Sequence, residues 1–552
     1  MKKSARYSIV LISLLFLPIA FSGFQDRDFE LSKNLDIYYT LMRELNLFYV
    51  DETDPGELVK ASVDQMLRTL DPYTSYIPES RMEDLQLMTT GEYGGIGALI
   101  RQREGYVIVT DPYEGFPAQK AGLRAGDIIR KIDGRKIADL NSSQIGELMK
   151  GQVGTKLKMT VERSEEKTPV EIDIVREKIR ISNVPYYQLL NDSYGYIRLS
   201  GFTQGAAKEV LAAFNELKDN GMEKLILDLR SNPGGLLIEA VDVMNIFVPN
   251  NQEIVSTIGK VKQWNKTYYC RREPADTTMP LVVLVNSQSA SAAEIVAGAV
   301  QDLDRGVVIG QRSFGKGLVQ TTRDLSYNSK LKLTTAKYYI PSGRCIQALD
   351  YSHRREDGSV GHIPDSLISE FATKNGRGVY DGGGILPDVE MPVRMLSRLS
   401  TALIYKDKFF DFATDFRNSM DEIDSPENFH LDDKYYTDFV HQLVKDSFHY
   451  ETASSRKLNE LIDVAKREKY YDKASNEIEE LKSLLETDLE KDTEIFAQEI
   501  KNILSDEILG RYYYQKGRIQ FMLKEDPLVH KAREILSNEN NNYTSILSKK
   551  KD

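Results

Sequence analysis

The chain has 552 residues, of which 41% are apolar and 28% charged, so it is long enough for several domains with buried cores. Acidic residues outnumber basic ones by 83 to 72, which gives a net charge of −11. This balance argues against a nucleic-acid-binding protein, because such proteins usually carry a basic face.

The N-terminus has the pattern of a secretory signal. Two lysines and an arginine within the first six residues precede an uncharged, mostly apolar run over residues 7–25. We predict a signal peptide over residues 1–22, cleaved after Ser22, and hence an exported, periplasmic protein. The alternative is an uncleaved anchor in the inner membrane, because the run is just long enough to span a bilayer.

Two regions of different texture follow. Residues 27–85 carry apolar side chains at three- and four-residue spacing, which predicts helices, and "DPYTSYIPES" closes them as a loop. Residues 86–180 contain short β-rich runs separated by turn residues, with one short helix in "SSQIGELMKG". We expect a small, mostly β domain there.

Strands alternate with helices over residues 181–397. The apolar runs "EKLILDLR", "PLVVLVN" and "GVVIG" predict strands, and helical patterns follow the first two. This alternation indicates a parallel sheet with crossover helices, and runs this apolar indicate strands covered on both faces.

Residues 398–552 are charged, rich in tyrosine and predicted to be helical. One segment carries an apolar stripe, for which we prefer helix packing or self-association over a ligand site; its members are Ile478, Leu481, Leu485, Leu489, Phe496 and Ile500. The final "NENNNYTSILSKKKD" is predicted to be a disordered polar tail.

The cysteines and histidines indicate little chemistry. Cys270 and Cys345 are the only cysteines, and in an exported protein they could form one disulfide or remain two buried thiols. The six histidines show no metal-ligand spacing, so we predict no metal site.

Polar loops follow the three predicted apolar strands. These loops are "SNPGG", "SQSAS" and "QRSFGKG". Because functional loops lie beyond the carboxyl ends of parallel strands, neighbouring strands would bring glycine amides, a serine and a lysine to one edge. That combination is sufficient for acyl transfer.

Ser291 is the strongest candidate for the nucleophile. With Glu294 it forms a Ser-x-x-Glu capping box that would begin a helix, and capping alone is the alternative role. The N–H of Ala292 would face a developing oxyanion, and a glycine amide of "NPGG" could be the second donor. Ser287 and Ser289 are predicted to be turn residues.

Lys316 is the candidate base. A lysine can accept a proton if burial lowers its pKa well below the usual value of about 10.4. Gly315 and Gly317 flank Lys316, and apolar side chains lie close in sequence, a setting that suits a partly desolvated amine. The alternative is an ordinary exposed loop lysine.

Together these motifs resemble the C-terminal processing peptidases, or tail-specific proteases. "NSQSASAAEIVAGAVQD" and "GQRSFGKGLVQ" carry the resemblance, with further likeness in "DLRSNPGG" and "YIPSGRCIQ". It covers residues 35–395. It implies Ser291 as nucleophile, Lys316 as base and Gln320 as the residue that orients the lysine.

The resemblance also implies an oxyanion hole with Gly234 or Gly235, and a multidomain α+β fold. That fold has a helical N-terminal segment, a PDZ-like β domain, an α/β protease domain like that of crotonase and ClpP, and a helical C-terminal extension. The extension lies outside the resemblance, so its role is not implied.

The β domain resembles the family's PDZ domain. Its loop "YGGIGALI" would hold a peptide's terminal carboxylate on successive amides of Gly94, Gly95, Ile96 and Gly97. The apolar pair Leu148–Met149 on the nearby short helix would favour an apolar last residue. The alternative is a PDZ-like domain that only packs against the protease domain.

These features predict a serine endopeptidase that captures the free C-terminus of an unfolded exported protein and cleaves near it, without metal or cofactor. Two other classes of protein remain open. One is a non-enzymatic peptide-binding scaffold, against which the joint serine, lysine, glutamine and Gly-Gly argue. The other is a crotonase-like acyl-CoA hydrolase, against which the PDZ-like domain and the export signal argue.

Overall fold

The computed structural model describes residues 28–103, 105–190, 193–393, 395–485, 487–537 and 539–548. The predicted signal peptide lies outside these ranges. The chain divides into two compact units. The described residues up to Glu79 form one unit with Gln320–Thr334, and the rest of the chain forms the other.

The first unit contains the predicted N-terminal helices. Residues 28–48 are helical, and α2 spans Pro55–Arg68. Asp54 caps α2 because its carboxylate accepts hydrogen bonds from the first-turn amides, and Pro55 stands where no amide hydrogen is needed. The predicted loop after α2 contains a short strand, β1 (Ser75–Ile77), which pairs with the start of β18 (Lys330–Tyr339). No described helix has the length and apolar composition to cross a bilayer.

The second unit begins with the predicted β domain. Its sheet has the order β3-β4-β5-β7-β8, with β6 beside β5, so β3 is an edge strand. The strands are β2 (Glu92–Gly95), β3 (Ala98–Arg103), β4 (Tyr106–Pro112), β5 (Ile128–Ile132), β6 (Arg135–Lys136), β7 (Lys156–Glu162), β8 (Val170–Val175) and β9 (Glu177–Arg180). The helices are α3 (Met82–Thr90), α4 (Pro117–Lys120) and α5 (Ser142–Met149).

Side chains along the strands of this small sheet are alternately buried and exposed, so one face of the sheet packs in the core. In β7, Leu157, Met159 and Val161 are buried, while Lys156 and Lys158 are exposed and Thr160 is partly buried. The predicted short helix is α5, and Asn141 begins it with a capping box. β2 pairs with β9 outside the main sheet and brings the two ends of the domain together.

A six-stranded sheet forms the centre of the second unit, in the order β10-β11-β12-β15-β16-β23. All neighbours are parallel except β10 and β11. The strands are β10 (Tyr186–Leu190), β11 (Tyr194–Arg198), β12 (Lys224–Asp228), β15 (Leu281–Val285), β16 (Val307–Gly310) and β23 (Val389–Glu390). The three strands predicted from apolar runs are therefore direct neighbours.

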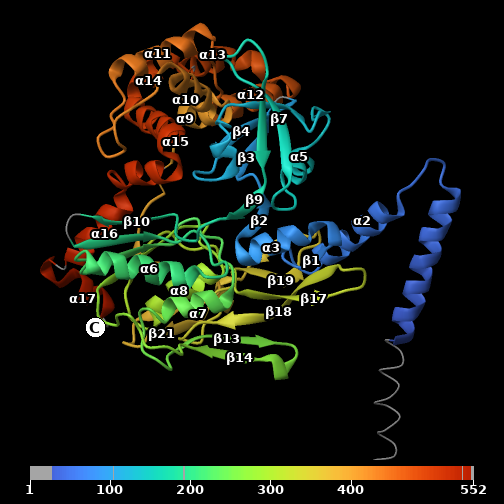
Figure 1. The fold of residues 1–552 in the computed structure, drawn as a ribbon, viewed down its shortest axis with the longest axis vertical. Coiled ribbons are helices and arrows are strands. Elements are labelled where there is room, and N and C mark those ends of the chain that lie inside the picture. The colour runs from blue at the N-terminus through green and yellow to red at the C-terminus, as the bar shows by residue number, and fades with distance from the viewer. Residues whose placement is uncertain are drawn as a thin grey trace, which may run out of the picture. The chain divides into compact units, whose positions relative to one another are not determined.

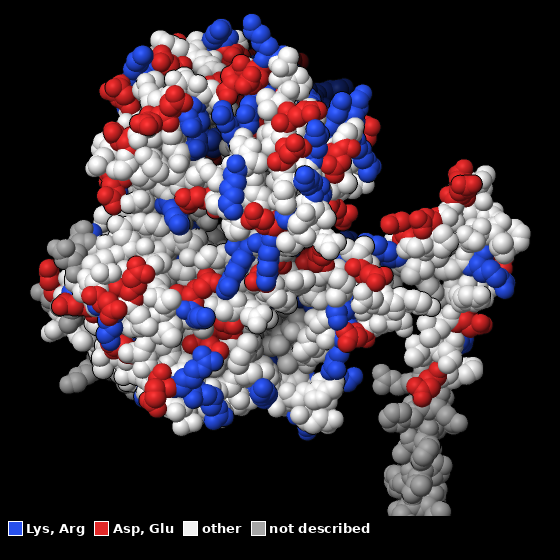
Figure 2. Space-filling view, in the orientation of Figure 1, with Lys and Arg blue, Asp and Glu red and all other residues white. Residues whose placement is uncertain are grey.

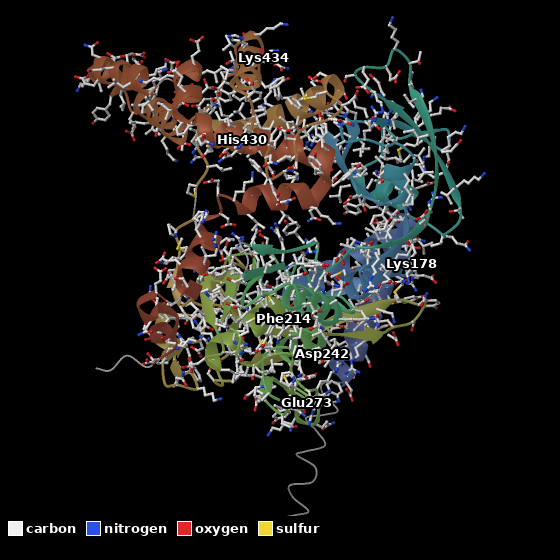
Figure 3. All side chains as sticks on the ribbon, turned by 60° about the vertical axis from the view of Figure 1, so that its left-hand side comes forward. Lys178, Phe214, Asp242, Glu273, His430 and Lys434 are labelled. Carbon is white, nitrogen blue, oxygen red and sulfur yellow. The ribbon has the colours of Figure 1, made fainter. Side chains whose placement is uncertain are left out.

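Helices cover one face of this sheet. They are α6 (Ala206–Asp219), α7 (Leu237–Met244) and α8 (Ala292–Asp302), which pack in a row (Figure 1). Phe214 of α6, labelled in Figure 3, is fully buried and lies edge-on to Phe247. All five residues of β15 are buried, as expected for a strand covered on both faces.

The end of the chain covers the other face. Side chains from the last turns of α15 (Ala497–Leu523) and from α16 (Pro527–Ser537) share a core cluster with outward-facing side chains of β12, β15 and β16. The predicted disordered tail is partly wrong, because α17 spans Asn542–Leu547. Tyr543 explains the difference, since its ring packs on this core and its hydroxyl accepts from the amide of Leu281 at 3.0 Å.

Smaller sheets are formed by strands that lie between the central strands in the sequence. Their strands are β13 (Glu253–Gly259), β14 (Lys266–Tyr269), β17 (Leu318–Asp324), β19 (Leu349–Arg354), β20 (Val360–His362), β21 (Glu370–Ala372) and β22 (Gly378–Tyr380). Cys270 and Cys345 are both free thiols, so of the two alternatives the structure has the unpaired one. Burial raises the pKa of the Cys270 thiol to about 12.

The C-terminal extension is helical, as predicted. Before α15 it contains α9 (Arg398–Tyr405), α10 (Lys408–Ser419), α11 (Asp433–Lys445), α12 (Ala453–Arg467), α13 (Ser475–Leu484) and α14 (Leu489–Ile495). Five of the six residues of the apolar stripe pack in two clusters, Ile478 and Leu485 with α12 and Leu489, Phe496 and Ile500 in the main helical core, while Leu481 is 43% exposed. Self-association stays a prediction.

Salt bridges connect this helical region to the β domain. Arg103 of β3 binds Asp411 of α10 at 2.7 Å, and Arg101 binds Asp407 at 2.7 Å. Elsewhere on the surface in Figure 2, acidic and basic side chains are interspersed, in keeping with a chain that is acidic overall but mixed in sign.

Candidate active site

The three predicted functional loops meet beyond the carboxyl ends of β12, β15 and β16. The amide of Ala290, in the loop after β15, donates to the carbonyl of Asn232 after β12 at 2.9 Å. The amide of Phe314, after β16, donates to the carbonyl of Ser289 at 3.0 Å. Main-chain hydrogen bonds therefore join all three loops at one edge of the sheet, as the sequence predicted.

Ser291 lies at the junction between its loop and α8. Its backbone has φ 56° and ψ −114°, a conformation that residues with a side chain rarely adopt and that costs roughly 1–3 kcal/mol. The residue is only partly buried, whereas every residue of α8 is buried. A strained turn that presents a serine at the start of a helix is the geometry of a nucleophile elbow.

Glu294 connects the serine to the lysine loop. Its carboxylate is fully buried and accepts four hydrogen bonds. Oε2 binds the amides of Ser291 at 2.8 Å and Lys316 at 2.9 Å, and Oε1 binds the Ser313 hydroxyl at 2.6 Å and the Gly315 amide at 2.7 Å. Burial raises the pKa of Glu294, while these four donors favour the ionised form.

The predicted capping box between Ser291 and Glu294 is present. The side chain of Glu294 accepts from the amide of Ser291 at 2.8 Å, and the amide of Glu294 also donates to the carbonyl of Ser291 at 2.9 Å. Tyr338 adds a further support, because its hydroxyl donates to the same carbonyl at 3.1 Å.

Lys316 lies between β16 and β17 and is partly buried. Its main chain is held by contacts of the glycines on either side. The amide of Gly317 donates to the side chain of Gln347 at 2.8 Å, and the carbonyl of Gly315 accepts from Ala348 at 2.9 Å. A Cβ on Gly315 would lie 2.4 Å from the Cβ of Ala348, so this close approach requires glycine.

The predicted oxyanion glycines lie beside the serine. A Cβ on Gly234 would come within 2.8 Å of the amide of Ala292 and of the Ser291 Cβ. The Gly234 amide already donates to the side chain of Asn232, at 2.8 Å. The amides of Gly235 and Ala292 have no acceptor among the described residues.

Two residues that the sequence did not single out hold these loops. Asn232 is fully buried, and its side chain also donates to the carbonyl of Leu199 at 2.7 Å. Ser289, predicted as a turn residue, is fully buried too, and its hydroxyl donates to Leu229 at 2.8 Å. Their position in the sequence could have predicted this role, because Asn232 directly precedes Pro-Gly-Gly and Ser289 stands two residues before Ser291.

Gln320, the predicted partner of the lysine, lies in β17 within the first unit. Its side-chain amide donates to the Thr334 hydroxyl at 3.2 Å. Its orienting role stays a prediction.

The predicted carboxylate-binding loop joins β2 to β3 in the β domain. The carbonyls of Ile96 and Gly97 are used, since they accept from Ala118 at 2.8 Å and Tyr113 at 2.9 Å. The amides of Ile96 and Gly97 have no acceptor in the described part of the chain. Gly94 and Gly95 belong to β2, which pairs with β9.

Other residues of the predicted peptide pocket are buried or partly buried. Ile96 and Met149 are both buried in the core of the β domain, while Leu148 is partly buried against it. Leu148 is therefore the better placed of the two predicted pocket residues.

Models of three known families match the chain. Residues 193–352 match peptidase family S41, residues 94–174 match the PDZ domain, and residues 399–536 match "Probable PDZ-protease, C-terminal helical domain". The last match covers the extension that lay outside the sequence resemblance.

Two bacterial relatives agree with these matches. A carboxy-terminal-processing protease of Bartonella bacilliformis is 36% identical over 376 residues, which cover 67% of this chain and 83% of the relative. A "Probable CtpA-like serine protease" of Staphylococcus aureus is 33% identical over 340 residues, 61% of this chain and 67% of the relative. Among solved structures, a photosystem II D1 C-terminal processing protease is 28% identical, with a TM-score of 0.35 over 64% of this chain and 86% of that one.

These relationships decide between the classes that the sequence left open. A peptidase family that covers β11, β12, β15 and β16 and the loops after them excludes both an inert peptide-binding scaffold and an acyl-CoA hydrolase. The chain belongs to the carboxy-terminal-processing proteases of peptidase family S41 and is a serine-type peptidase with a PDZ domain and a C-terminal helical domain.

Proposed function

We propose that Ser291 and Lys316 form the catalytic dyad of this peptidase. The observation that carries the proposal is the binding of both residues' amides to one oxygen of buried Glu294. This shared acceptor holds the main chains of the two residues side by side. The strained backbone of Ser291 supports the same assignment.

The reaction then runs through an acyl-enzyme. Lys316 Nζ accepts the hydroxyl proton as Ser291 Oγ bonds to the carbonyl carbon of the substrate peptide. The C–N bond breaks as the lysine returns that proton to the leaving amine, and Ser291 retains the acyl group as an ester. Lys316 next takes a proton from water, whose oxygen attacks the ester, and gives it to Ser291 as the acid product leaves.

The amides of Ala292 and Gly235 would stabilise the oxyanion. Both are unused, whereas Gly234 would have to release Asn232 before its amide could serve. Gly234 instead provides the space that the close approach to Ser291 requires. Fixed donors aimed at the developing charge are usually the largest single contribution to such a reaction.

The PDZ domain would select the substrate by its free C-terminus. The unused amides of Ile96 and Gly97 precede edge strand β3, so a peptide could add to that edge with its carboxylate on the loop. The bacterial carboxy-terminal-processing relatives and the N-terminal signal pattern support action on unfolded exported proteins in the periplasm.

Incubation with an unfolded test protein, followed by mass spectrometry of the products, tests the dyad. We expect wild-type protein to cut near the C-terminus and Ser291→Ala to lose more than about 10³-fold in rate, with its thermal unfolding little changed. Cleavage at the wild-type rate by folded Ser291→Ala would disprove the nucleophile assignment.

A further inference from the structure

A charge network lies beneath the loop that carries the oxyanion glycines. Asp228, at the end of β12, is fully buried and binds the Arg230 guanidinium at 2.6 Å. The hydroxyl of Tyr196 also donates to Asp228, at 2.6 Å. Arg230 is the first loop residue with a charged side chain, four positions before Gly234. The buried carboxylate of Asp228 thus fixes the position of Arg230 at the start of the loop.

The second carboxylate on Arg230 comes from the far end of the chain. Asp526 Oδ2 binds Arg230 Nη2 at 2.7 Å, and only 12% of the Asp526 side chain is exposed. Its other oxygen, Oδ1, accepts from the amides of Leu528 at 2.9 Å and Val529 at 3.3 Å. Asp526 therefore caps α16 with one oxygen and holds Arg230 with the other.

The helix that follows Asp526 is tightly packed on the central sheet. Val529, Ala532 and Ile535 of α16 are at most 2% exposed and pack against the outer face of the central sheet. Asp526 is thus fixed to the same sheet as the catalytic loops. A bridge between buried charged groups has a defined geometry, because neither partner is free to reorient in water.

Arg230 leads directly into the contacts that set the glycine loop. The amide of Ser231 donates to the Asn286 side chain at 2.9 Å, and Asn232 binds both Ala290 and Gly234. A shift at Arg230 would therefore move the Gly235 amide relative to Ala292. Displacements of about 1 Å can cost 10²-fold in rate.

We propose that Asp526 is a positioning residue for the peptidase reaction. Through Arg230 it holds the glycine loop where the Gly235 and Ala292 amides can both reach the oxyanion. The proposal rests on the oxyanion hole of the proposed function. It gives the C-terminal helical domain a part in transition-state stabilisation.

The variant Asp526→Asn separates positioning from folding. Asparagine caps a helix as well as aspartate does, but its single oxygen cannot cap α16 and bind Arg230 together. We expect kcat for a peptide substrate to fall about tenfold with KM within twofold, because only the transition state carries the oxyanion. The affinity for a peptide boronate, a transition-state analogue, should fall by the same factor.

Two further variants serve as controls. Glu534→Gln removes an exposed carboxylate from the same helix, where it pairs with Lys531 at 2.7 Å, and should leave kcat unchanged. Asp526→Glu keeps the charge and should recover part of the loss. Active-site titration gives the folded fraction of each variant, so that kcat refers to competent enzyme.

The outcomes are distinguishable. An unchanged kcat and boronate affinity in Asp526→Asn would overturn the positioning role, as would a loss that active-site titration attributes to unfolded protein. A rise in KM alone would also overturn it. Cleavage by Ser291→Ala in the same assay would refute the proposed dyad instead.

Discussion

Glu294 accepts the amide hydrogen of Lys316 at 2.9 Å, although the two residues are 22 positions apart. The same oxygen accepts from the residue that begins α8. One buried carboxylate thus sets the spacing between the two halves of the proposed dyad, without itself contacting a substrate in the proposed mechanism.

The first prediction concerns this carboxylate. Glu294→Gln should lower kcat by about 10²-fold, because a glutamine NH2 group must face one of the two donor pairs and release it. Each buried donor left without an acceptor should lower the free energy of unfolding by about 1–3 kcal/mol. Steady-state kinetics and chemical denaturation measure the two effects, with Glu216→Gln on the exposed side of α6 as control. A fully active Glu294→Gln enzyme would show that the shared acceptor is dispensable.

The second prediction concerns the base. Lys316→Arg keeps the charge but should abolish cleavage, because arginine stays protonated and cannot accept the serine's proton. The wild-type rate should rise with pH as the lysine loses its proton, and it should level off above the lysine pKa. A pH–rate profile measures this, with Lys218→Arg as a matched exchange on the surface. Substantial activity in Lys316→Arg would mean that the lysine binds substrate rather than acting as a base.

The third prediction concerns the PDZ loop. A peptide with an apolar last residue should bind full-length Ser291→Ala protein at least tenfold more tightly as the free acid than as the amide, a difference of about 1.4 kcal/mol. Charge-assisted hydrogen bonds from the Ile96 and Gly97 amides are the reason. Paired titration calorimetry gives both affinities. Equal affinities for the two peptides would mean that the protease cleft, and not this loop, provides the specificity for the C-terminus.

The fourth prediction concerns the cover of the central sheet. Ile535→Ala in α16 should lower the free energy of unfolding by about 2–5 kcal/mol, because the side chain is only 2% exposed in a shared core. Hydrogen exchange should accelerate in β15 and β16. Leu484→Ala, at a side chain that is 76% exposed, should change stability by less than about 0.5 kcal/mol. Equal effects of the two substitutions would contradict the close packing of α16.

Local patterns explain what the sequence could predict. Residues 225–227, 281–285 and 307–309 are apolar throughout, as expected for strands buried on both faces, and the loops that follow these strands contain the candidate site residues. The start of α8 at Ser291 was predictable from a cap that depends on residues three apart. These signals lie within a few residues of each other.

Long-range contacts explain what was missed. Glu294 was predicted as a cap, but its bonds to Ser313 and Gly315 depend on where the loop after β16 passes. Nothing near Asp526 indicates a partner in the glycine loop. The sequence around Tyr543 is polar, so its composition did not predict that the ring of Tyr543 packs on the core beside the sheet.

The packing of α16 on the sheet has a consequence for the folding of the enzyme during its synthesis. The side chains of α15 and α16 that cover the outer face of β12, β15 and β16 come far later in the chain than these strands. Until both helices have been synthesised, the sheet that carries the loops of Ser291 and Lys316 therefore has one uncovered apolar face.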